Sequence, residues 1–497
     1  MAYKSEVNGA PALGMGPVHH FLKDLAERGM RLHSLLVHWR GRTVLDLWQW
    51  PHEPDLSHKL HSATKSFTGT AIGFAEAEGL LGLDDPIIGF FEGRLPVAPG
   101  ENLSRMRVRD LLTMQTGHGR GMSGATTRLR RTGWVGEFLE EPVVELPGHS
   151  FRYSSTASHV LSAIVQQVSG QPVDEYLRPR LFEPLGIAGY EWERDPEGVA
   201  SGGNGLSLRP RDLLSFGILY LQDGVWEGKR ILPSGWVRKA SAPHVRRAIS
   251  GEWNGKELIP PGPDAVADSG YGFQFWTTED RIYSASGIFG QECMVFPDED
   301  GVVVVTGAMG DGTYHDLPEM IRERFRDAFD GTARDEPSEA DAVRQWVLRA
   351  RDPELLDPSA RRAGFSEAYD FDANEQGLRS LSVEVRADSV LLVLDDERGR
   401  HAIEHGVGYW VRQGTSVSVW RLHHSYQDPS AEIVAAAEWS SGDPDVLSLT
   451  WHFLESPFID RLTLTFGADD VTVGRGVNVN SGATELPAAQ GIRREQC

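Results

Sequence analysis

A serine and a lysine three positions apart, Ser62 and Lys65, are the residues of this chain whose types and spacing suit covalent chemistry. Residues at this spacing lie on the same face of a helix, so the lysine amine can reach the serine hydroxyl. An amine at its ordinary pKa of about 10.4 is protonated, and lowering that pKa to about 7 costs roughly 4.6 kcal/mol. Burial and a nearby cation can provide that energy. The pair therefore predicts nucleophilic acyl transfer.

The Ser-x-x-Lys spacing is weak evidence when taken alone, because so short a motif arises by chance in a long chain. Two features strengthen it. The chain has seven lysines, and of these Lys65 is the one that lies in such a spacing. The stretch Ser62–Gly79 also carries few charges, which favours a buried lysine, and an unpaired buried lysine is uncommon in a purely structural role.

A tyrosine at a predicted loop-to-helix junction could assist the serine. Tyr153 follows Pro147-Gly148 and precedes the apolar run His159–Val168. A phenol at such a junction can be aimed at a nucleophile and relay protons, with Lys65 holding the pKa of the phenol down. The structural alternative is a half-buried tyrosine with its hydroxyl in water, which is commoner for a single tyrosine.

A third segment, Tyr283–Gln291, reads as a strand that ends at two glycines, Gly287 and Gly290. Such a strand exposes its edge backbone to a ligand. Its N–H groups could form half of an oxyanion hole, and the N–H of Ser62 could form the other half. Taken alone, this segment is better explained as a β-hairpin turn.

Together, the order and spacing of these elements resemble the serine β-lactamase and penicillin-binding-protein-like hydrolases. The resemblance covers residues Leu32 to Phe329 and extends to the phrases HSLLVHWRGRTVLD, SATKSFTGTAIGFAEAEGLLGLDDPI, MRVRDLLTMQTGH, LRPRLFEPLGI and GLSLRPRDLLSFGILYL. The family includes class C β-lactamases, family VIII carboxylesterases, D-aminopeptidases, 6-aminohexanoate-dimer hydrolases and penicillin-binding-protein-type thioesterases. The phrase SGIFGQ is most like the esterase and aminohexanoate-hydrolase branch.

The resemblance implies a role for each matching residue. Ser62 would be the acylated nucleophile and Lys65 its general base or proton relay. Tyr153 matches the tyrosine of the family's Tyr-x-Asn box and would protonate the leaving group. Ala285-Ser286-Gly287 matches the third box, usually Lys-Thr-Gly or His-x-Gly. The N–H of Ile288, which follows that box, would join the N–H of Ser62 in the oxyanion hole.

Two departures from the family pattern bear on the substrate, which the resemblance would place against Ser155, Ala285, Ser286 and Gly287. Ser155 stands where many members have an Asn that contacts the acyl side-chain amide. Ala285 stands where Lys or His would bind a substrate carboxylate or assist the tyrosine. The missing cation weakens the case for a dedicated β-lactamase or D,D-peptidase and favours neutral ester, thioester or amide substrates.

The elements that must position these residues predict one mixed α/β domain over residues 1–330. Strand-like runs lie at both ends of this segment and helical runs lie between them, so its sheet would bring the two ends together. The predicted fold is the β-lactamase/transpeptidase-like one, an antiparallel sheet flanked by helices with an all-α subdomain. The runs are 32–38 and 43–48 as a hairpin, helices at 62–79, 107–114, 159–168 and 210–221, and strands at 281–286, 292–296 and 302–307.

The rest of the chain predicts a second, all-β domain. Residues 331–370 read as a charged linker with a helix at 338–351, residues 371–484 as an up-and-down barrel or a sandwich, and residues 485–497 as a frayed tail. This part resembles the lipocalin-like barrels appended to some family members. Such a domain could cover the mouth of the active site, build a dimer or serve stability alone. Its predicted strands are 378–385, 389–394, 407–412, 415–422, 432–439, 446–453, 461–466 and 470–480.

Composition excludes several classes of partner. The chain has 49 Lys and Arg against 71 Asp and Glu, for a net charge of −22, which repels nucleic acids and anionic lipid head groups. Two cysteines cannot build a disulfide framework, and no histidine spacing completes a zinc-protease motif, so neither a metal nor a cofactor is expected. The start of the chain lacks a signal-peptide pattern, and no apolar stretch is long enough to span a membrane, so we expect a cytoplasmic protein.

These residues predict a serine hydrolase that acts on carboxyl esters or small amides through an acyl-enzyme on Ser62. On the same machinery, an acyltransferase or cyclising thioesterase, or a D-aminopeptidase or β-lactamase-type amidase, stays open, and a non-catalytic binding protein is the least favoured alternative. A small-molecule substrate is expected as the partner, and a homo-oligomer is left open. Arg246–Ser269 is a candidate lid, and His58 and His61 are expected to lie at the surface or to shape the pocket.

Overall fold

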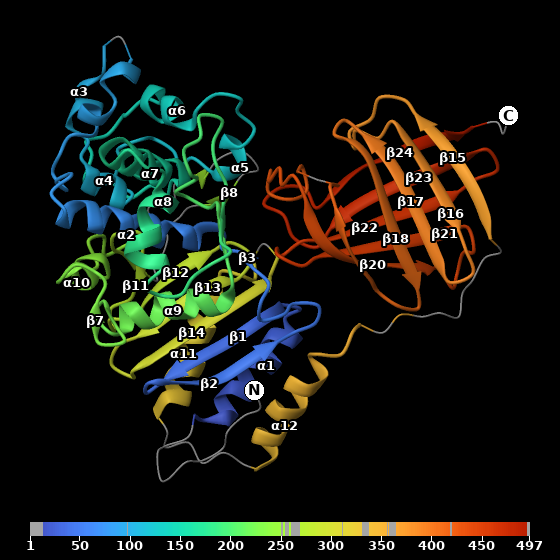
Figure 1. The fold of residues 1–497 in the computed structure, drawn as a ribbon, viewed down its shortest axis with the longest axis horizontal. Helices are drawn as coiled ribbons and strands as arrows, with labels where there is room; N and C mark the ends of the chain where they lie inside the picture. Colours follow the sequence, from blue (N-terminus) through green and yellow to red (C-terminus); the bar gives the residue numbers. More distant parts are fainter. Residues whose placement is uncertain are drawn as a thin grey trace. The chain divides into compact units, whose positions relative to one another are not determined.

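The computed structural model describes residues 13–96, 98–249, 252–253, 258–259, 269–310, 312–330, 337–354, 356, 364–417 and 420–494. The chain forms two compact units. The first holds most of the chain up to Val347, and the second holds the chain from Leu348 onward together with Gln49–Glu53 and Ala308–Asp311. Figure 1 shows the two units as an α/β body and a body of strands. None of the described helices combines the length and the apolar character that crossing a membrane requires.

The first unit is built on an antiparallel sheet, which in the described chain has seven strands. The order β14–β1 in this sheet places a strand from the end of the first unit beside one from its start, as predicted. In sheet order the strands are β10 (Gly270–Tyr271), β11 (Trp276–Thr277), β12 (Tyr283–Gly287), β13 (Gln291–Phe296), β14 (Gly301–Ala308), β1 (Arg31–Trp39) and β2 (Arg42–Trp48).

Helices cover both faces of this sheet, which explains why β13 and β14 are buried along their whole length. Neighbouring strand residues point to opposite faces. A Cβ on Gly217 of α9 (Pro210–Leu221) would contact Val302, whereas a Cβ on Gly301 would contact Phe329 of α11 (Leu317–Asp330). The two helices therefore lie on opposite faces, and α1 (Met15–Glu27) packs beside α11.

A helical layer holds the segments that carry the serine and the tyrosine. Helix α7 (Ser155–Ser169) packs against α2 (Thr64–Ala77). Ser154 caps the start of α7 by accepting a hydrogen bond from Ala157 N, and Gly170 ends the helix in a left-handed conformation with φ +73°. Around α7 lie α4 (Val108–Leu112), α6 (Trp134–Glu140) and α8 (Val173–Leu177).

Shorter elements complete the first unit. Its remaining helical turns are η1 (His61–Ala63), η2 (Ile87–Phe90), η3 (Glu92–Arg94), α3 (Glu101–Arg105), α5 (Gly124–Thr127), η4 (Arg178–Phe182), α10 (Trp236–Ala240) and α12 (Pro337–Arg349). Its small sheets pair β3 (His58–Lys59) and β4 (Glu191–Trp192) with β5 (Leu206–Leu208), β6 (Val225–Trp226) with β7 (Lys229–Arg230), and β8 (Glu252–Trp253) with β9 (Leu258–Ile259).

The second unit is a closed β-barrel. Among the described residues nine strands form the ring, and β19 lies outside it, paired with β20. Neighbours around the ring are antiparallel except β18 and β20, which pair in parallel through Gly406 and Val407. An odd number of alternating strands forces one parallel pair when a ring closes. The strands are β15 (Phe365–Phe371), β16 (Ser380–Val385), β17 (Ser389–Asp396), β18 (Gly399–Val407), β19 (Val411–Thr415), β20 (Ala431–Trp439), β21 (Val446–Phe453), β22 (Ile459–Phe466), β23 (Asp470–Val477) and β24 (Glu485–Arg493).

The predicted fold class is confirmed, but three features of the barrel differ from the prediction. The strand expected at 407–412 spans the turn between β18 and β19, where Gly408 has φ +86°. The strand expected at 415–422 is wrong, because β19 ends at Thr415 and residues 420–425 form turns, with 418–419 outside the described residues. The linker expected at 331–370 is wrong at its end, because residues 365–370 belong to strand β15.

The tail expected at 485–497 is also wrong for residues 485–493, which form β24. This strand pairs with both β15 and β23 and so completes the ring. Within β24 the fully buried residues are Ala489 and Gly491, both small, so the apolar alternation that marks a strand is nearly absent from its sequence. The strand is held by backbone pairing with β15 and β23, and this pairing leaves no mark in the pattern of side chains.

Candidate active site

Ser62 lies in the helical turn η1, directly before helix α2. The residue before it, His61, has φ +47°, an uncommon backbone conformation for a residue with a side chain. The ring of His61 lies edge-on to that of Phe289, which has φ +67°, with ring centroids 5.3 Å apart. Two left-handed residues therefore contact each other beside the serine, one on each segment of the expected site.

Lys65 is buried, with 1% of its surface exposed, and its amine faces three oxygens. Nζ lies 3.0 Å from Ser62 Oγ, 3.1 Å from Ser155 Oγ and 2.6 Å from the carbonyl oxygen of Gly203. A neutral amine has two protons and one lone pair. The carbonyl of Gly203 can only accept a proton, whereas the hydroxyls of Ser62 and Ser155 can each accept or donate. A neutral amine that donates to Gly203 and Ser155 therefore has its lone pair available for the hydroxyl of Ser62.

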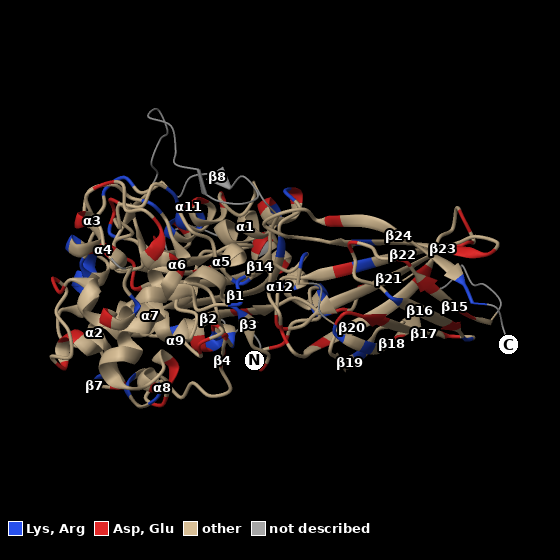
Figure 2. Cartoon of the chain, turned by 90° about the horizontal axis from the view of Figure 1, so that it is seen from above, with Lys and Arg blue, Asp and Glu red and all other residues tan. Residues whose placement is uncertain are grey.

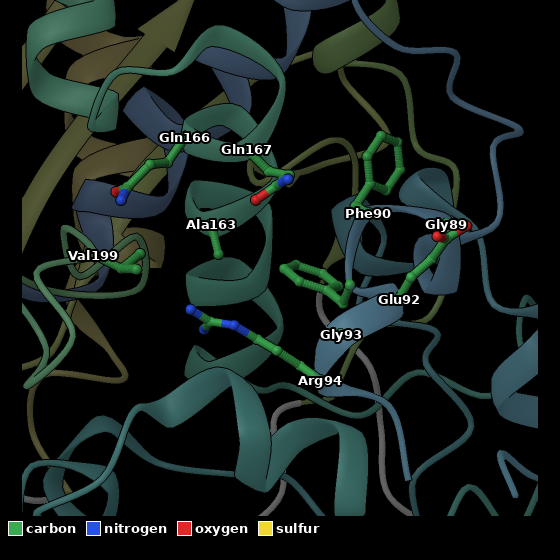
Figure 3. A pocket seen from close by; sticks show the side chains of 10 residues that line it. Gly89, Phe90, Glu92, Gly93, Arg94, Ala163, Gln166, Gln167 and Val199 are labelled. Carbon is green, nitrogen blue, oxygen red and sulfur yellow. The ribbon is translucent and has the colours of Figure 1, made fainter. Parts of the chain in front are cut away.

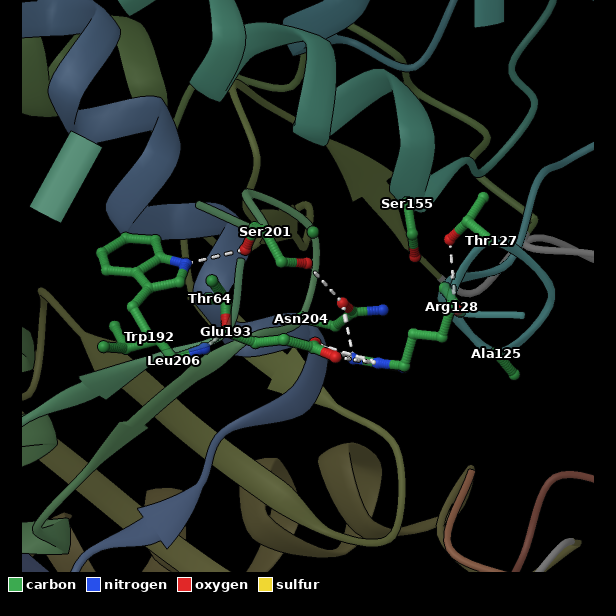
Figure 4. Close-up of polar contacts among 12 residues, drawn as sticks. Thr64, Ala125, Thr127, Arg128, Ser155, Trp192, Glu193, Ser201, Asn204 and Leu206 are labelled. Carbon is green, nitrogen blue, oxygen red and sulfur yellow. Dashed lines mark hydrogen bonds and ion pairs between the residues drawn. The ribbon is translucent and has the colours of Figure 1, made fainter. Parts of the chain in front are cut away.

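The surroundings of Lys65 favour this neutral form. Burial holds the pKa of Lys65 well below its usual value, and the charge of Arg128 lowers it further. Arg128 is fixed by two partners (Figure 4): its guanidinium binds both carboxylate oxygens of Glu193, at 2.8 Å each, and donates to Asn204 Oδ1 at 2.9 Å. The sequence analysis did not single out Arg128, because its spacing from the serine in the sequence carries no signal.

The loop that supplies the Gly203 carbonyl is anchored at several points, some of them drawn in Figure 4. Ser201 Oγ donates to Asn204 Oδ1 at 2.9 Å, and Trp192 Nε1 donates to the carbonyl oxygen of Ser201 at 2.8 Å. Leu206 N donates to Thr64 Oγ1 at 3.1 Å, on the helix that carries Lys65. The lysine and its carbonyl partner are therefore held in one rigid frame.

Tyr153 reaches the same serine. Its phenol interacts with Ser62, which lowers the pKa of the phenol, and its ring lies 4.8 Å from Lys65 Nζ and stacks on Trp276 with centroids 5.5 Å apart. Burial raises the pKa of Tyr153 above its usual value, and the contact with Ser62 offsets this only in part. The expectation that Lys65 lowers the pKa of this phenol is therefore wrong, because desolvation of the phenolate dominates. The phenol stays protonated and can donate its proton.

The third box approaches the serine through a glycine. A Cβ on Gly287 would lie 2.2 Å from the carbonyl oxygen of Leu60 and 3.2 Å from Ser62 N, so this position leaves no room for a side chain. Strand β11 pairs with β12 at Tyr283 and Ser284, and its register stops there. The backbone from residue 285 to 287 therefore lies beyond this pairing and next to the N–H of Ser62, and Ile288 begins the turn that follows.

The side chains of the box alternate between the two faces of the sheet. Ala285 is buried, with 2% of its surface exposed, and offers no cation. Ser286 is partly exposed, and its Oγ donates to Glu292 Oε1 at 2.7 Å. The sequence analysis missed Glu292, although a charged residue in the otherwise uncharged run QECMVF was a usable signal.

The remaining predicted residues fall in several places. Ser155 begins α7, and its Oγ contacts Lys65, so the structure brings together Ser62, Lys65, Tyr153 and Ser155. His58 Nε2 lies 3.0 Å from His33 Nδ1 and is buried. Most of the candidate lid Arg246–Ser269 lies outside the described residues.

A separate cavity of about 440 Å³ opens between η2, η3 and α7 (Figure 3). None of the residues named above lines it. Its wall consists of Gly89, Phe90, Phe91, Glu92, Gly93, Arg94, Ala163, Gln166, Gln167 and Val199.

The comparison with known families agrees with this geometry. The family model described as Beta-lactamase matches residues 19–323, which is more than half of the chain. The chain belongs to the beta-lactamase family. The matched range contains the serine, the lysine, the tyrosine and the third box.

Two relatives of this beta-lactamase-family chain are named as hydrolases. It is 28% identical over 287 residues to the 6-aminohexanoate-dimer hydrolase of Paenarthrobacter ureafaciens, a match that covers 53% of this chain and 70% of that protein. It is 26% identical over 181 residues to the Esterase/beta-lactamase LipL of Mycobacterium tuberculosis, covering 33% of this chain and 39% of that one. The chain thus matches less than half the length of the second relative. These matches support a serine hydrolase.

Solved structures share the fold. The octameric penicillin-binding protein homologue from Pyrococcus abyssi matches 96% of this chain and 99% of its own, with a TM-score of 0.50 and 16% identity. A putative beta-lactamase from Bacteroides dorei matches 63% of this chain and 100% of its own, with a TM-score of 0.51 and 17% identity. At such identities the likeness concerns the fold alone.

Proposed function

We propose that this chain hydrolyses carboxyl esters or small amides through an acyl-enzyme on Ser62. The observation that carries the proposal is the hydrogen-bond set of Lys65, whose amine lies within hydrogen-bond distance of Ser62 Oγ, Ser155 Oγ and the Gly203 carbonyl. In its neutral form the amine can donate its two protons to Ser155 and Gly203 and accept the proton of Ser62. A buried amine with a lowered pKa is the base that this chemistry needs at neutral pH.

The steps follow from the atoms present. Lys65 Nζ takes the proton of Ser62 as Oγ bonds to the carbonyl carbon of the substrate. The N–H groups of Ser62 and Ile288 would stabilise the oxyanion, and removing one such donor typically costs about 10²–10³ in rate. Tyr153 gives its proton to the leaving group as the bond to the carbonyl carbon breaks, and Lys65 returns a proton to the phenol. Water then takes the place of the leaving group and attacks the acyl carbon, losing its proton to Lys65 through Tyr153. Lys65 gives a proton back to Ser62 Oγ as the acyl–serine bond breaks.

The substrate class follows from the third box. Ala285 carries no charge, so the box lacks the cation that would bind a substrate carboxylate. The names of the two relatives, 6-aminohexanoate-dimer hydrolase and Esterase/beta-lactamase LipL, include an esterase, which supports ester substrates. We therefore place small esters and amides without a carboxylate at this position first among the substrates to test.

The test is covalent labelling. The full chain should react with a fluorophosphonate probe and show a burst of p-nitrophenol with p-nitrophenyl acetate, and Ser62→Ala should abolish both. Ser215→Ala is the matched control, because the hydroxyl of Ser215 donates to the carbonyl of Arg211 on the surface of α9, and it should label like the wild type. Absence of a label on the wild type, or a label that survives in Ser62→Ala, would contradict the proposal.

A further inference from the structure

A buried carboxyl lies directly behind the third box. Glu292 of β13 is the cross-strand partner of Ser286 of β12, and it is 2% exposed. Ser286 Oγ donates to Glu292 Oε1 at 2.7 Å, and Ser284 Oγ lies 3.1 Å from Ser286 Oγ. Ser286 thus contacts the carboxyl directly, and Ser284 contacts Ser286. The two serines and the glutamate therefore form one polar cluster, which we call the Glu292 cluster.

The Glu292 cluster is unusual because, among the described residues, no cation forms an ion pair with the carboxyl of Glu292. The ion pairs of the described residues do not include Glu292, and the groups that stabilise its charged form are the two hydroxyls. Burial raises the pKa of Glu292 to about 7, while the hydroxyls act in the opposite direction. A substantial fraction of the molecules therefore carries a negative charge here at neutral pH. Such a residue is costly for stability and is often functional.

The bond to Glu292 fixes what Ser286 can offer a ligand. A serine hydroxyl has one proton, and in this structure that proton points at the carboxylate. The oxygen of Ser286 is then left with lone pairs and can only accept a hydrogen bond. Ser286 is partly exposed and directly precedes Gly287, whose Cα faces Ser62 N. A substrate that extends from Ser62 along residues 285–287 would meet an acceptor here with a negative charge behind it.

We propose that Glu292 determines the charge specificity of the site: through Ser286 it favours acyl substrates that are cationic or donate a hydrogen bond beside the third box, and it rejects those that carry a carboxylate there. This inference rests on the proposed function and deepens it. Because Ala285 has no positive charge, the third box does not attract a substrate carboxylate. The negative charge of Glu292 would in addition repel that carboxylate. Like charges brought together in this way reduce binding of the wrong partner.

The experiment compares three p-nitrophenyl esters of similar length: the pentanoate, which is neutral, the mono-ester of glutarate, which is anionic, and the ester of 4-(trimethylammonio)butyrate, which is cationic. For the full-length wild type, kcat/KM for the neutral and cationic esters should exceed that for the anionic ester by about tenfold or more. In Glu292→Gln the neutral-to-anionic ratio should fall towards one through a rise for the anionic ester. Its kcat/KM for the neutral ester should stay within about threefold.

Two controls keep the result interpretable. Glu279→Gln removes an exposed charge near β11 and should leave the ratio unchanged. Glu292→Met, an apolar residue suited to a buried strand, repeats the test if the Gln variant does not fold. Equal turnover of the anionic and neutral esters by the wild type, or an unchanged ratio in both neutral variants, would overturn the inference. Fluorophosphonate labelling of Ser62 in the same samples reports the proposed function separately, because that probe is uncharged.

Discussion

At the scale of single residues, the site is a set of proton donors and acceptors whose assignments constrain one another. The amine of Lys65 lies within hydrogen-bond distance of Ser62 Oγ, Ser155 Oγ and the Gly203 carbonyl. Burial lowers the pKa of Lys65 and so favours the neutral amine, and it raises the pKa of Tyr153 and so favours the protonated phenol. The same physical cause, desolvation, thus prepares one residue as a base and the other as an acid.

Arg128→Met should move the acidic limb of the pH–activity profile to higher pH. The base works when Lys65 is unprotonated, so activity rises as pH rises through its pKa, and the charge of Arg128 lowers that pKa. Removing the charge raises the pKa, so the variant loses activity at low pH and approaches its own plateau at high pH. The measurement is kcat/KM against pH with a neutral ester.

Arg128→Lys is the matched control for this prediction. It retains the positive charge but loses the two-pronged contact with Glu193. Its maximal rate is expected to fall while its acidic limb stays near that of the wild type. An acidic limb that does not move in Arg128→Met would show that burial alone sets the pKa of Lys65.

At the scale of elements, a strand and the start of a helix form the proposed oxyanion hole. The turn η1 brings Ser62 N to the side of β12, and Gly287 lets the two backbones meet, because a Cβ there would lie 2.2 Å from the Leu60 carbonyl oxygen. The contact joins the helical layer to the sheet at Ser62. The position of the box relative to the serine therefore depends on one residue without a side chain.

Gly287→Ala should reduce kcat by about 10²–10³, the typical effect of disturbing one oxyanion donor. The added methyl group pushes β12 away from Ser62 N, so labelling of Ser62 by a fluorophosphonate should slow in parallel. Gly414→Ala is the control: Gly414 also lies in a strand, β19, and a Cβ there meets no atom within 4 Å. A Gly287→Ala enzyme with normal kcat would exclude this strand from the oxyanion hole.

At the scale of the whole molecule, the feature to explain is the excess of acidic over basic residues. Figure 2 shows Asp and Glu interspersed with Lys and Arg along the chain. Many of these charges are paired on the surface, and such pairs contribute little stability individually. The net charge of −22 therefore describes mainly the surface, whereas the amine of Lys65 and the carboxyl of Glu292 are buried.

Closure of the barrel gives a prediction at this scale. A Cβ on Gly491 of β24 would lie 2.5 Å from the ring of Phe371 on β15, so Gly491→Ala should overpack this seam and cost about 1–3 kcal/mol of unfolding free energy. Gly474→Ala on β23 is the control, because the nearest atom to its Cβ is 3.8 Å away. Thermal or urea unfolding of the full chain measures both. Equal stability of the two variants would contradict the role given to this seam.

The sequence by itself determined much of the framework, because those features are local. The spacing of Ser62 and Lys65 predicted one helical face. The apolar runs 159–168 and 210–221 predicted helices, which the structure contains as part of α7 and as α9. The antiparallel fold class followed from the resemblance and the order of strands. Strand β24 was not predicted from the sequence, because its buried residues are small. It is defined by its backbone pairing with β15 and β23.

Only the tertiary structure decided how the site is tuned. Arg128 and Glu292 lie 63 and 227 residues beyond Lys65 in the sequence, and no spacing rule connects them to it. Their effects arise from burial, which removes water and strengthens charge interactions over a few ångströms. Burial is a property of the whole packed domain. The sequence therefore indicated candidate reactive side chains, whereas the fold determined their burial and their hydrogen-bond partners.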